Sequence, residues 1–274
     1  MTYLPFEKIF DLKKNKNKIL IVLTAVVSLL FYAPSWADDA TPAASMSVPT
    51  ATQDQAPSVS TMPTNYEMVQ APTAYVLANG GYDLVTEVYE NGGLYLRGNV
   101  GFKNFFMFGF SANGTNMIGQ GTIQIQTPKL FFKFKILDQS MAPFALAVAW
   151  DDRGYGTFTD NRFEPGTQKG FYTVISHEYP ELGYLQTHLG FNLVEFDNFD
   201  ASQDLGVFGG ISFAVTKPLV FNLEADKVFS SQWAFNANFL FNVDTPLRVG
   251  LDLVDINNPG LFSRIVRIQY TGFF

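Results

Sequence analysis

The chain contains no cysteine and only two histidines, His177 and His188, among its 274 residues. The absence of cysteine excludes a disulfide framework, a thiolate metal site and a lipid-modified N-terminal cysteine. The net charge is −7 at pH 7, so nothing indicates a polyanion-binding surface, and we expect no nucleic-acid partner. From residue 72 onward no window longer than a turn or two follows the helical period, which argues against a helical fold.

The N-terminal residues 1–37 have the layout of a secretory signal peptide. Four lysines between residues 13 and 18 precede an apolar run at 19–32, and Ser35-Trp36-Ala37 is a plausible cleavage site. The alternative is an uncleaved inner-membrane anchor, but the apolar run is short against the ~20 residues that a spanning helix needs. The sequence therefore predicts a cleaved signal peptide and an exported protein.

Residues 38–71 are rich in Pro, Ser, Thr, Ala and Gln and show no apolar period. Such a segment cannot bury enough apolar surface to offset the entropy lost on ordering. We predict a disordered periplasmic tail. A tether to a periplasmic partner is the functional interpretation of this tail, although no residue in it identifies the partner.

Residues 72–274 alternate apolar and polar side chains, and turn residues interrupt the pattern about every ten positions, as in a ladder of antiparallel strands. One side of these strands is apolar and aromatic, and the chain has 28 Phe. The apolar series are Leu94, Leu96, Val100 and Phe102; Leu130, Phe132, Phe134 and Ile136; Phe235, Phe239 and Phe241; and Leu247, Val249 and Leu251.

Besides a membrane barrel, two soluble all-β architectures produce such alternation, a β-sandwich and a small barrel with an apolar interior. The segments have the ~9–11 residues that a tilted membrane-spanning strand needs, and their polar face carries too many charges for a dry sandwich core. We therefore predict a single transmembrane antiparallel β-barrel over 72–274. About fourteen strands are favoured, with a weak first strand at 73–79, and twelve is the alternative if 73–79 and 82–90 lie outside the wall.

The last strand ends on an aromatic residue at the C-terminus, as the closing strand of bacterial outer-membrane barrels does. Ile268, Tyr270 and Phe274 alternate with Arg267 and Gln269. We expect the first three to face lipid and to form the signal that the barrel insertion machinery reads. If Phe274 lies at the periplasmic side, the longest connections all fall on the outer side. The expected location is the bacterial outer membrane, with its lipid as a partner.

Catalytic and metal sites find little support in the sequence. Ser176 lies beside His177, but the strand register puts His177 at a periplasmic strand end and His188 in the lumen, so we expect no enzyme. Asp151, Asp152 and Asp160 lie in a glycine-containing loop, but their spacing is not that of an EF-hand. An ordinary polar loop is the better interpretation, and no metal or cofactor is expected.

Charged and polar side chains on the inward face are the candidate functional residues, because charged rows set selectivity in pores. Such a lumen is either an open narrow channel or one that its own side chains fill. The predicted function is a porin-like channel for small polar solutes or ions, and the alternative is a structural or assembly barrel. The predicted lumen-lining residues are Arg97, Lys129, Lys133, Lys135, His188, Glu224, Asp226, Arg248, Asp252 and Arg267.

Several short motifs resemble those of Gram-negative outer-membrane barrels related to the YjbH-type exopolysaccharide-associated proteins. They are Pro72-Thr73-Ala74 and residues 133–137, 143–148, 152–156, 169–172 and 174–176, within roughly 72–190. The resemblance implies an outer-membrane barrel with a link to surface polysaccharide secretion. This chain lacks the lipoprotein cysteine of that type and is shorter, and the resemblance assigns no functional residue.

Overall fold

The computed structural model describes residues 65–119, 121–153, 157–159, 162–164, 169–182, 184–193, 205–216, 218–228, 233–244 and 246–274. The predicted signal peptide and the predicted tail up to residue 64 lie outside this part of the chain. Within the described residues, no helix combines the length and the apolar content needed to cross a bilayer.

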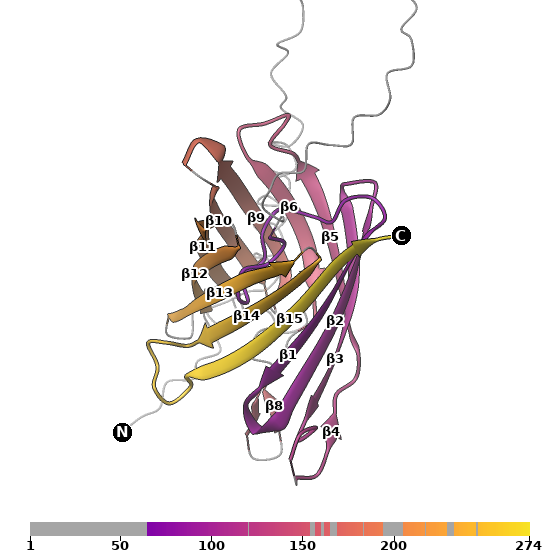
Figure 1. The fold of residues 1–274 in the computed structure, drawn as a ribbon, viewed down its shortest axis with the longest axis vertical. Coiled ribbons are helices and arrows are strands. Elements are labelled where there is room, and N and C mark those ends of the chain that lie inside the picture. The colour runs from indigo at the N-terminus through magenta and orange to yellow at the C-terminus, as the bar shows by residue number, and fades with distance from the viewer. Residues whose placement is uncertain are drawn as a thin grey trace, which may run out of the picture. The chain divides into compact units, whose positions relative to one another are not determined.

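Twelve antiparallel strands form a closed wall (Figure 1). Each strand pairs with its neighbours along the wall, and β1 closes the ring by pairing with β15 from Gly81↔Phe273 to Val88↔Val266. The strands are β1 (Gly81–Tyr89), β2 (Gly93–Phe102), β3 (Phe106–Thr115), β5 (Lys129–Leu137), β6 (Ala145–Asp151), β9 (Gly170–Tyr179), β10 (Leu185–Leu193), β11 (Leu205–Thr216), β12 (Leu219–Val228), β13 (Ala234–Asp244), β14 (Leu247–Val254) and β15 (Ser263–Phe273).

The remaining elements lie in the connections. The short strand β4 (Gln124–Ile125) pairs only with the end of β3, and β7 (Thr157–Thr159) and β8 (Arg162–Glu164) form a small separate hairpin. Two 3-10 turns, η1 (Glu90–Gly92) and η2 (Pro180–Leu182), follow β1 and β9. None of these elements contributes to the wall.

The all-β barrel is therefore confirmed, with the alternative count of twelve strands. The favoured count of fourteen is wrong, because residues 73–79 are not a wall strand and β4 joins no second neighbour. Residues 82–90 were expected outside a twelve-stranded wall, but they largely coincide with β1, which closes the ring.

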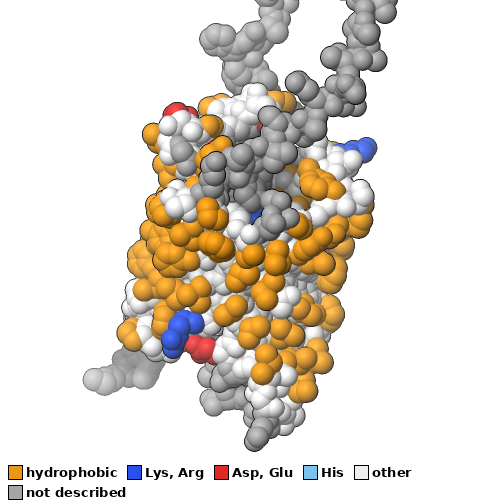
Figure 2. Space-filling model, viewed as in Figure 1, with side chains coloured by type: hydrophobic (Ala, Val, Ile, Leu, Met, Phe, Trp, Pro, Cys, Tyr) orange, Lys and Arg blue, Asp and Glu red, His pale blue; other side chains and the backbone are white. Residues whose placement is uncertain are grey.

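The wall is apolar outside and polar inside. On β15 the side chains of Val266, Ile268 and Tyr270 are 48%, 45% and 41% exposed, whereas Arg267 and Gln269 are buried. Figure 2 shows hydrophobic side chains over most of one outer face. This arrangement inverts that of a water-soluble protein, in which alternation places the apolar face inward.

Residues 65–79, here called the lumen segment, run inside the ring (Figure 1). Met68, Val69, Ala71, Ala74 and Leu77 are each at most 2% exposed. The segment folds back on itself: Glu67 pairs with Pro72, and the Thr73 N–H donates to the Tyr66 carbonyl at 3.1 Å. Residues 65–71 thus differ from the predicted disordered tail, because the barrel wall supplies the burial that their own composition lacks.

Candidate functional site: a lumen filled by the chain's own segment

Glu224 on β12 holds the tip of the lumen segment. The backbone N–H groups of Val69, Gln70 and Ala71 donate to its carboxylate at 2.8–3.1 Å. The Asn236 amide on neighbouring β13 donates to the same carboxylate at 2.6 Å. Three successive amides converging on one buried carboxylate form an anion-binding turn, and here the anion belongs to the wall.

Lys133 on β5 is the cationic counterpart. Its ammonium donates to the carbonyls of Tyr66, Thr73 and Tyr75 at 3.0–3.2 Å. An ammonium has three donors, so the lumen segment satisfies all of them. The side chain is only 1% exposed, and removing the segment would leave a buried charge without these partners.

Two further wall residues bind the backbone of the lumen segment. The Arg267 guanidinium on β15 donates to the carbonyls of Met68 and Val69 at 2.9 and 2.7 Å. The Ser176 hydroxyl on β9 accepts from the Ala74 N–H at 2.7 Å. The wall therefore recognises the segment largely through its backbone.

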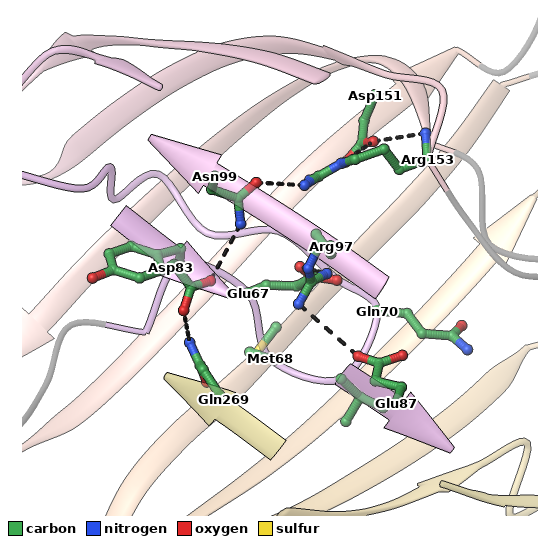
Figure 3. Close-up of polar contacts among 12 residues, drawn as sticks. Glu67, Met68, Gln70, Asp83, Glu87, Arg97, Asn99, Asp151, Arg153 and Gln269 are labelled. Carbon is green, nitrogen blue, oxygen red and sulfur yellow. Dashed lines mark hydrogen bonds and ion pairs between the residues drawn. The ribbon is translucent and has the colours of Figure 1, made fainter. Parts of the chain in front are cut away.

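Glu67 of the lumen segment lines the same small cavity as four cationic wall side chains, which are Arg97, Arg267, Arg153 and Lys133. Figure 3 shows Glu67 with Arg97 and Arg153. Glu67 forms an ion pair with Arg97 on β2. Burial alone would raise the pKa of the Glu67 carboxyl, but the four cations outweigh burial and hold the pKa below its ordinary value. The remaining free space beside it is a cavity of about 20 Å³, room for about one water molecule.

A polar network continues from this point along the wall (Figure 3). Asp83 accepts hydrogen bonds from Asn99 at 3.2 Å and from Gln269 at 2.8 Å. Asn99 in turn accepts from Arg153 at 2.6 Å, and Arg153 pairs with Asp151 at 2.9 Å. The interior thus holds a connected network of charged and amide groups beside an apolar cluster that the lumen segment forms with the wall.

Ser176 and His188 form a buried pair, with Ser176 Oγ 2.8 Å from His188 Nδ1. The His188 Nε2 atom is buried and has no hydrogen-bond partner among the described residues. Within the described part of the chain, no third group orients the imidazole as in a hydrolase triad. The Ser176 hydroxyl already accepts a hydrogen bond from the Ala74 N–H. Ser176 and His188 therefore anchor the lumen segment. His177 is half-buried, and its ring bonds to the Pro143 carbonyl.

The predicted lumen residues divide into two groups by position. Lys129, Lys135 and Asp226 lie towards strand ends and pair with Asp152, Asp138 and Lys169, respectively. Buried inside the ring are Arg97, Lys133, His188, Glu224, Arg248, Asp252 and Arg267. The structure brings Arg97, Lys133, Glu224 and Arg267 together through the lumen segment.

The C-terminal residues predicted as the insertion signal point outward. Ile268, Tyr270 and Phe274 are 45%, 41% and 88% exposed. The loop considered for Ca²⁺ is only partly described, and there Asp151 pairs with Arg153 and Asp152 with Lys129. Among the described residues, no cluster of His, Asp and Glu is arranged to hold a metal ion.

Sequence reasoning missed several residues of the site, namely Glu67, Asp83, Glu87, Arg153 and Lys169. Asp83 and Glu87 could have been found, because they alternate with Leu84 and Thr86 along β1. Arg153 and Lys169 flank a loop and follow no strand period. Glu67 carries no local signal, because its importance arises from cations on distant strands.

The sequence matches no family model and no curated protein. Among solved structures, a KdgM porin is 12% identical, with a TM-score of 0.46, over 71% of this chain and 99% of that one. A KdgM porin in complex with disordered oligogalacturonate is 12% identical, with a TM-score of 0.43, and the match covers 71% of this chain and 99% of that one. The Acinetobacter baumannii outer membrane protein Omp33 is 9% identical, with a TM-score of 0.38, and the match covers 71% of this chain and 97% of that one. At TM-scores below 0.5 we draw no functional conclusion from these similarities. The YjbH-type resemblance finds no support in them.

Proposed function

We propose that the protein is a porin-like channel of the bacterial outer membrane, and that the lumen segment closes its lumen in the state described here. The observation that carries this proposal is the charged inner face. There the Lys133 ammonium donates to the backbone of a segment outside the wall, and the Glu224 carboxylate accepts from the backbone of the same segment. If the segment withdraws, a polar lumen remains, through which small polar solutes or ions can pass.

The outer surface supports the location. Burying apolar surface is favourable by about 25 cal/mol per Å², and the outward Phe, Leu, Ile and Val side chains extend around the ring. A closed barrel leaves no unpaired strand edge, so it is the sheet architecture that lipid accepts. We take outer-membrane lipid as the partner of this belt. The role of Ile268, Tyr270 and Phe274 towards the insertion machinery stays a prediction, which an assembly assay after deletion of Phe274 would test.

The filled lumen also favours a second function, a structural or assembly barrel that serves surface polysaccharide export or a larger envelope complex. The cavity beside Glu67 has room for about one water molecule, and a permanently docked segment would make the barrel a scaffold. A periplasmic partner of residues 38–71 would belong to this second proposal. The two functions differ in one measurable property, which is whether the lumen segment leaves the lumen.

A disulfide that locks the lumen segment separates the two proposals. The native chain has no cysteine, so the pair Ala74→Cys and Ser176→Cys is the only thiol pair in the variant. The Ala74 nitrogen and the Ser176 hydroxyl are 2.7 Å apart, which keeps the two Cα atoms within the ~7 Å that a disulfide can bridge. In a planar bilayer under voltage, we expect conductance steps from the reduced variant and silence after oxidation.

The two single-cysteine variants are the controls, and oxidant should leave their conductance unchanged. Equal conductance of the oxidised and reduced double variant would contradict a path through the lumen. If wild type, the reduced variant and a variant with a weakened lumen segment are all silent, the channel proposal fails and the scaffold proposal stands.

A further inference from the structure

Four cations from four parts of the wall converge where Glu67 lies. Arg97 is on β2, Lys133 on β5, Arg153 just after β6, and Arg267 on β15. All four are at most 7% exposed, whereas the Glu67 side chain is 23% exposed. The cations are fixed in the wall, and the carboxylate is the accessible member of the cluster.

The wall's own acidic groups pair unevenly with these cations. Arg267 pairs with Asp252 at 2.6 Å and Glu87 at 3.1 Å, and Arg153 pairs with Asp151. Arg97 reaches Glu87 only at 4.0 Å. Lys133 donates to carbonyls of the lumen segment. When the lumen segment withdraws, Arg97 and Lys133 therefore lose their main partners together.

A vacated site of this kind suits a carboxylate. Guanidinium groups bind carboxylates through parallel charge-assisted hydrogen bonds, and an ammonium adds a point charge beside them. The side chain that the protein itself places there is a carboxylate, so the geometry is already shown to accept that group.

We propose that the position of Glu67 is a binding site for the carboxylate group of an acidic solute, and that Glu67 occupies it as a tethered competitor. The acidic solute would be one that passes through the proposed channel. Its passage rests on the proposed function, whereas its binding at the Glu67 position does not. A tethered group acts at an effective concentration of roughly millimolar, so a solute must exceed this or make further contacts to displace it.

Chemical rescue in the full-length protein tests the site. Glu67→Ala removes the tethered carboxylate and leaves the four cations in place. We expect the variant to melt at a lower temperature than wild type in detergent, and sodium acetate to raise its melting temperature in a saturable manner. Acetamide, which has the same shape without the charge, should have no such effect.

Two variants serve as matched controls. Glu67→Gln fills the site with a neutral side chain of the same shape, and the variant should show no saturable response to acetate. Adding Arg97→Met to Glu67→Ala removes the ion-pairing cation and should abolish the response. An equal response of wild type, Glu67→Gln and Glu67→Ala, or an equal effect of acetamide, would overturn the site.

The melting assay requires no conductance, so its outcome is separate from that of the channel. Saturable rescue together with silent bilayers would refute the channel and keep the carboxylate site. Conductance without rescue in Glu67→Ala would keep the channel and refute the site.

Discussion

Lys133 and Lys129 show how the environment of a residue decides its contribution. They are four positions apart on β5 and both point inward. Lys133 is 1% exposed and donates to three carbonyls. The Lys129 side chain is 35% exposed and pairs with Asp152 at 3.0 Å. A buried charge without its partners costs several kcal/mol, whereas an exposed ion pair contributes little.

Lys133→Met should therefore release the lumen segment. The change removes the hydrogen bonds that Lys133 donates to three carbonyls of the segment, and we expect a loss of about 3 kcal/mol in the docking of the segment. Faster cleavage of residues 65–79 by an added protease, with the barrel itself resistant, would report this loss.

Lys129→Met is the matched control, with an expected effect within about 0.5 kcal/mol. Equal cleavage rates for the two variants would show that the three carbonyl contacts do not hold the segment in the lumen.

At the scale of elements, alternation predicted the wall but could not predict the lumen segment. Strand periodicity is a local signal, and the alternating series at 94–102, 130–136, 235–241 and 247–251 fall within β2, β5, β13 and β14. The lumen segment has no period of its own. Its partners Asn222, Glu224 and Arg267 lie about 150 to 200 positions away in the sequence. The alternation of β1 is weak, because the apolar Val85 lies on its inward face between Asp83 and Glu87 and the polar Thr86 lies on its outward face.

At Gly101 on β2 the lumen segment passes close to the wall. A Cβ atom added there would lie 2.6 Å from the Leu77 Cβ and under 3.0 Å from the backbone oxygens of Leu77 and Ala78. Gly101→Ala should therefore push the segment away from the wall at a cost of about 1–3 kcal/mol. Hydrogen exchange of the amides in residues 65–79 would measure the loosening.

Gly98→Ala, on the same strand, is the control. Its Cβ would meet the Phe110 ring at 3.0 Å, a contact that a side-chain rotation relieves, so exchange in residues 65–79 should not change. Unchanged exchange in Gly101→Ala as well would mean that the segment is not packed against β2 in solution.

At the scale of the whole molecule, the inverted polarity makes the bilayer part of the folded structure. The outward side chains gain their burial from lipid, so the cost of a charge on that face should depend on its depth. Phe239 lies at the middle of β13 and Val243 near its end, on the same outward face, and they are 43% and 53% exposed. Their similar exposure allows depth to be compared at nearly constant accessibility.

Phe239→Arg should cost about 2–4 kcal/mol in the free energy of unfolding from lipid vesicles, and Val243→Arg about 0–1 kcal/mol. Phe239 also packs on Phe221, with ring centroids 4.7 Å apart, so Phe239→Ala measures the packing contribution that must be subtracted. Urea titration in vesicles gives all three values. If the two arginine variants lose the same free energy after this correction, the belt does not lie in lipid, and the barrel would have to shield its outer face in another way.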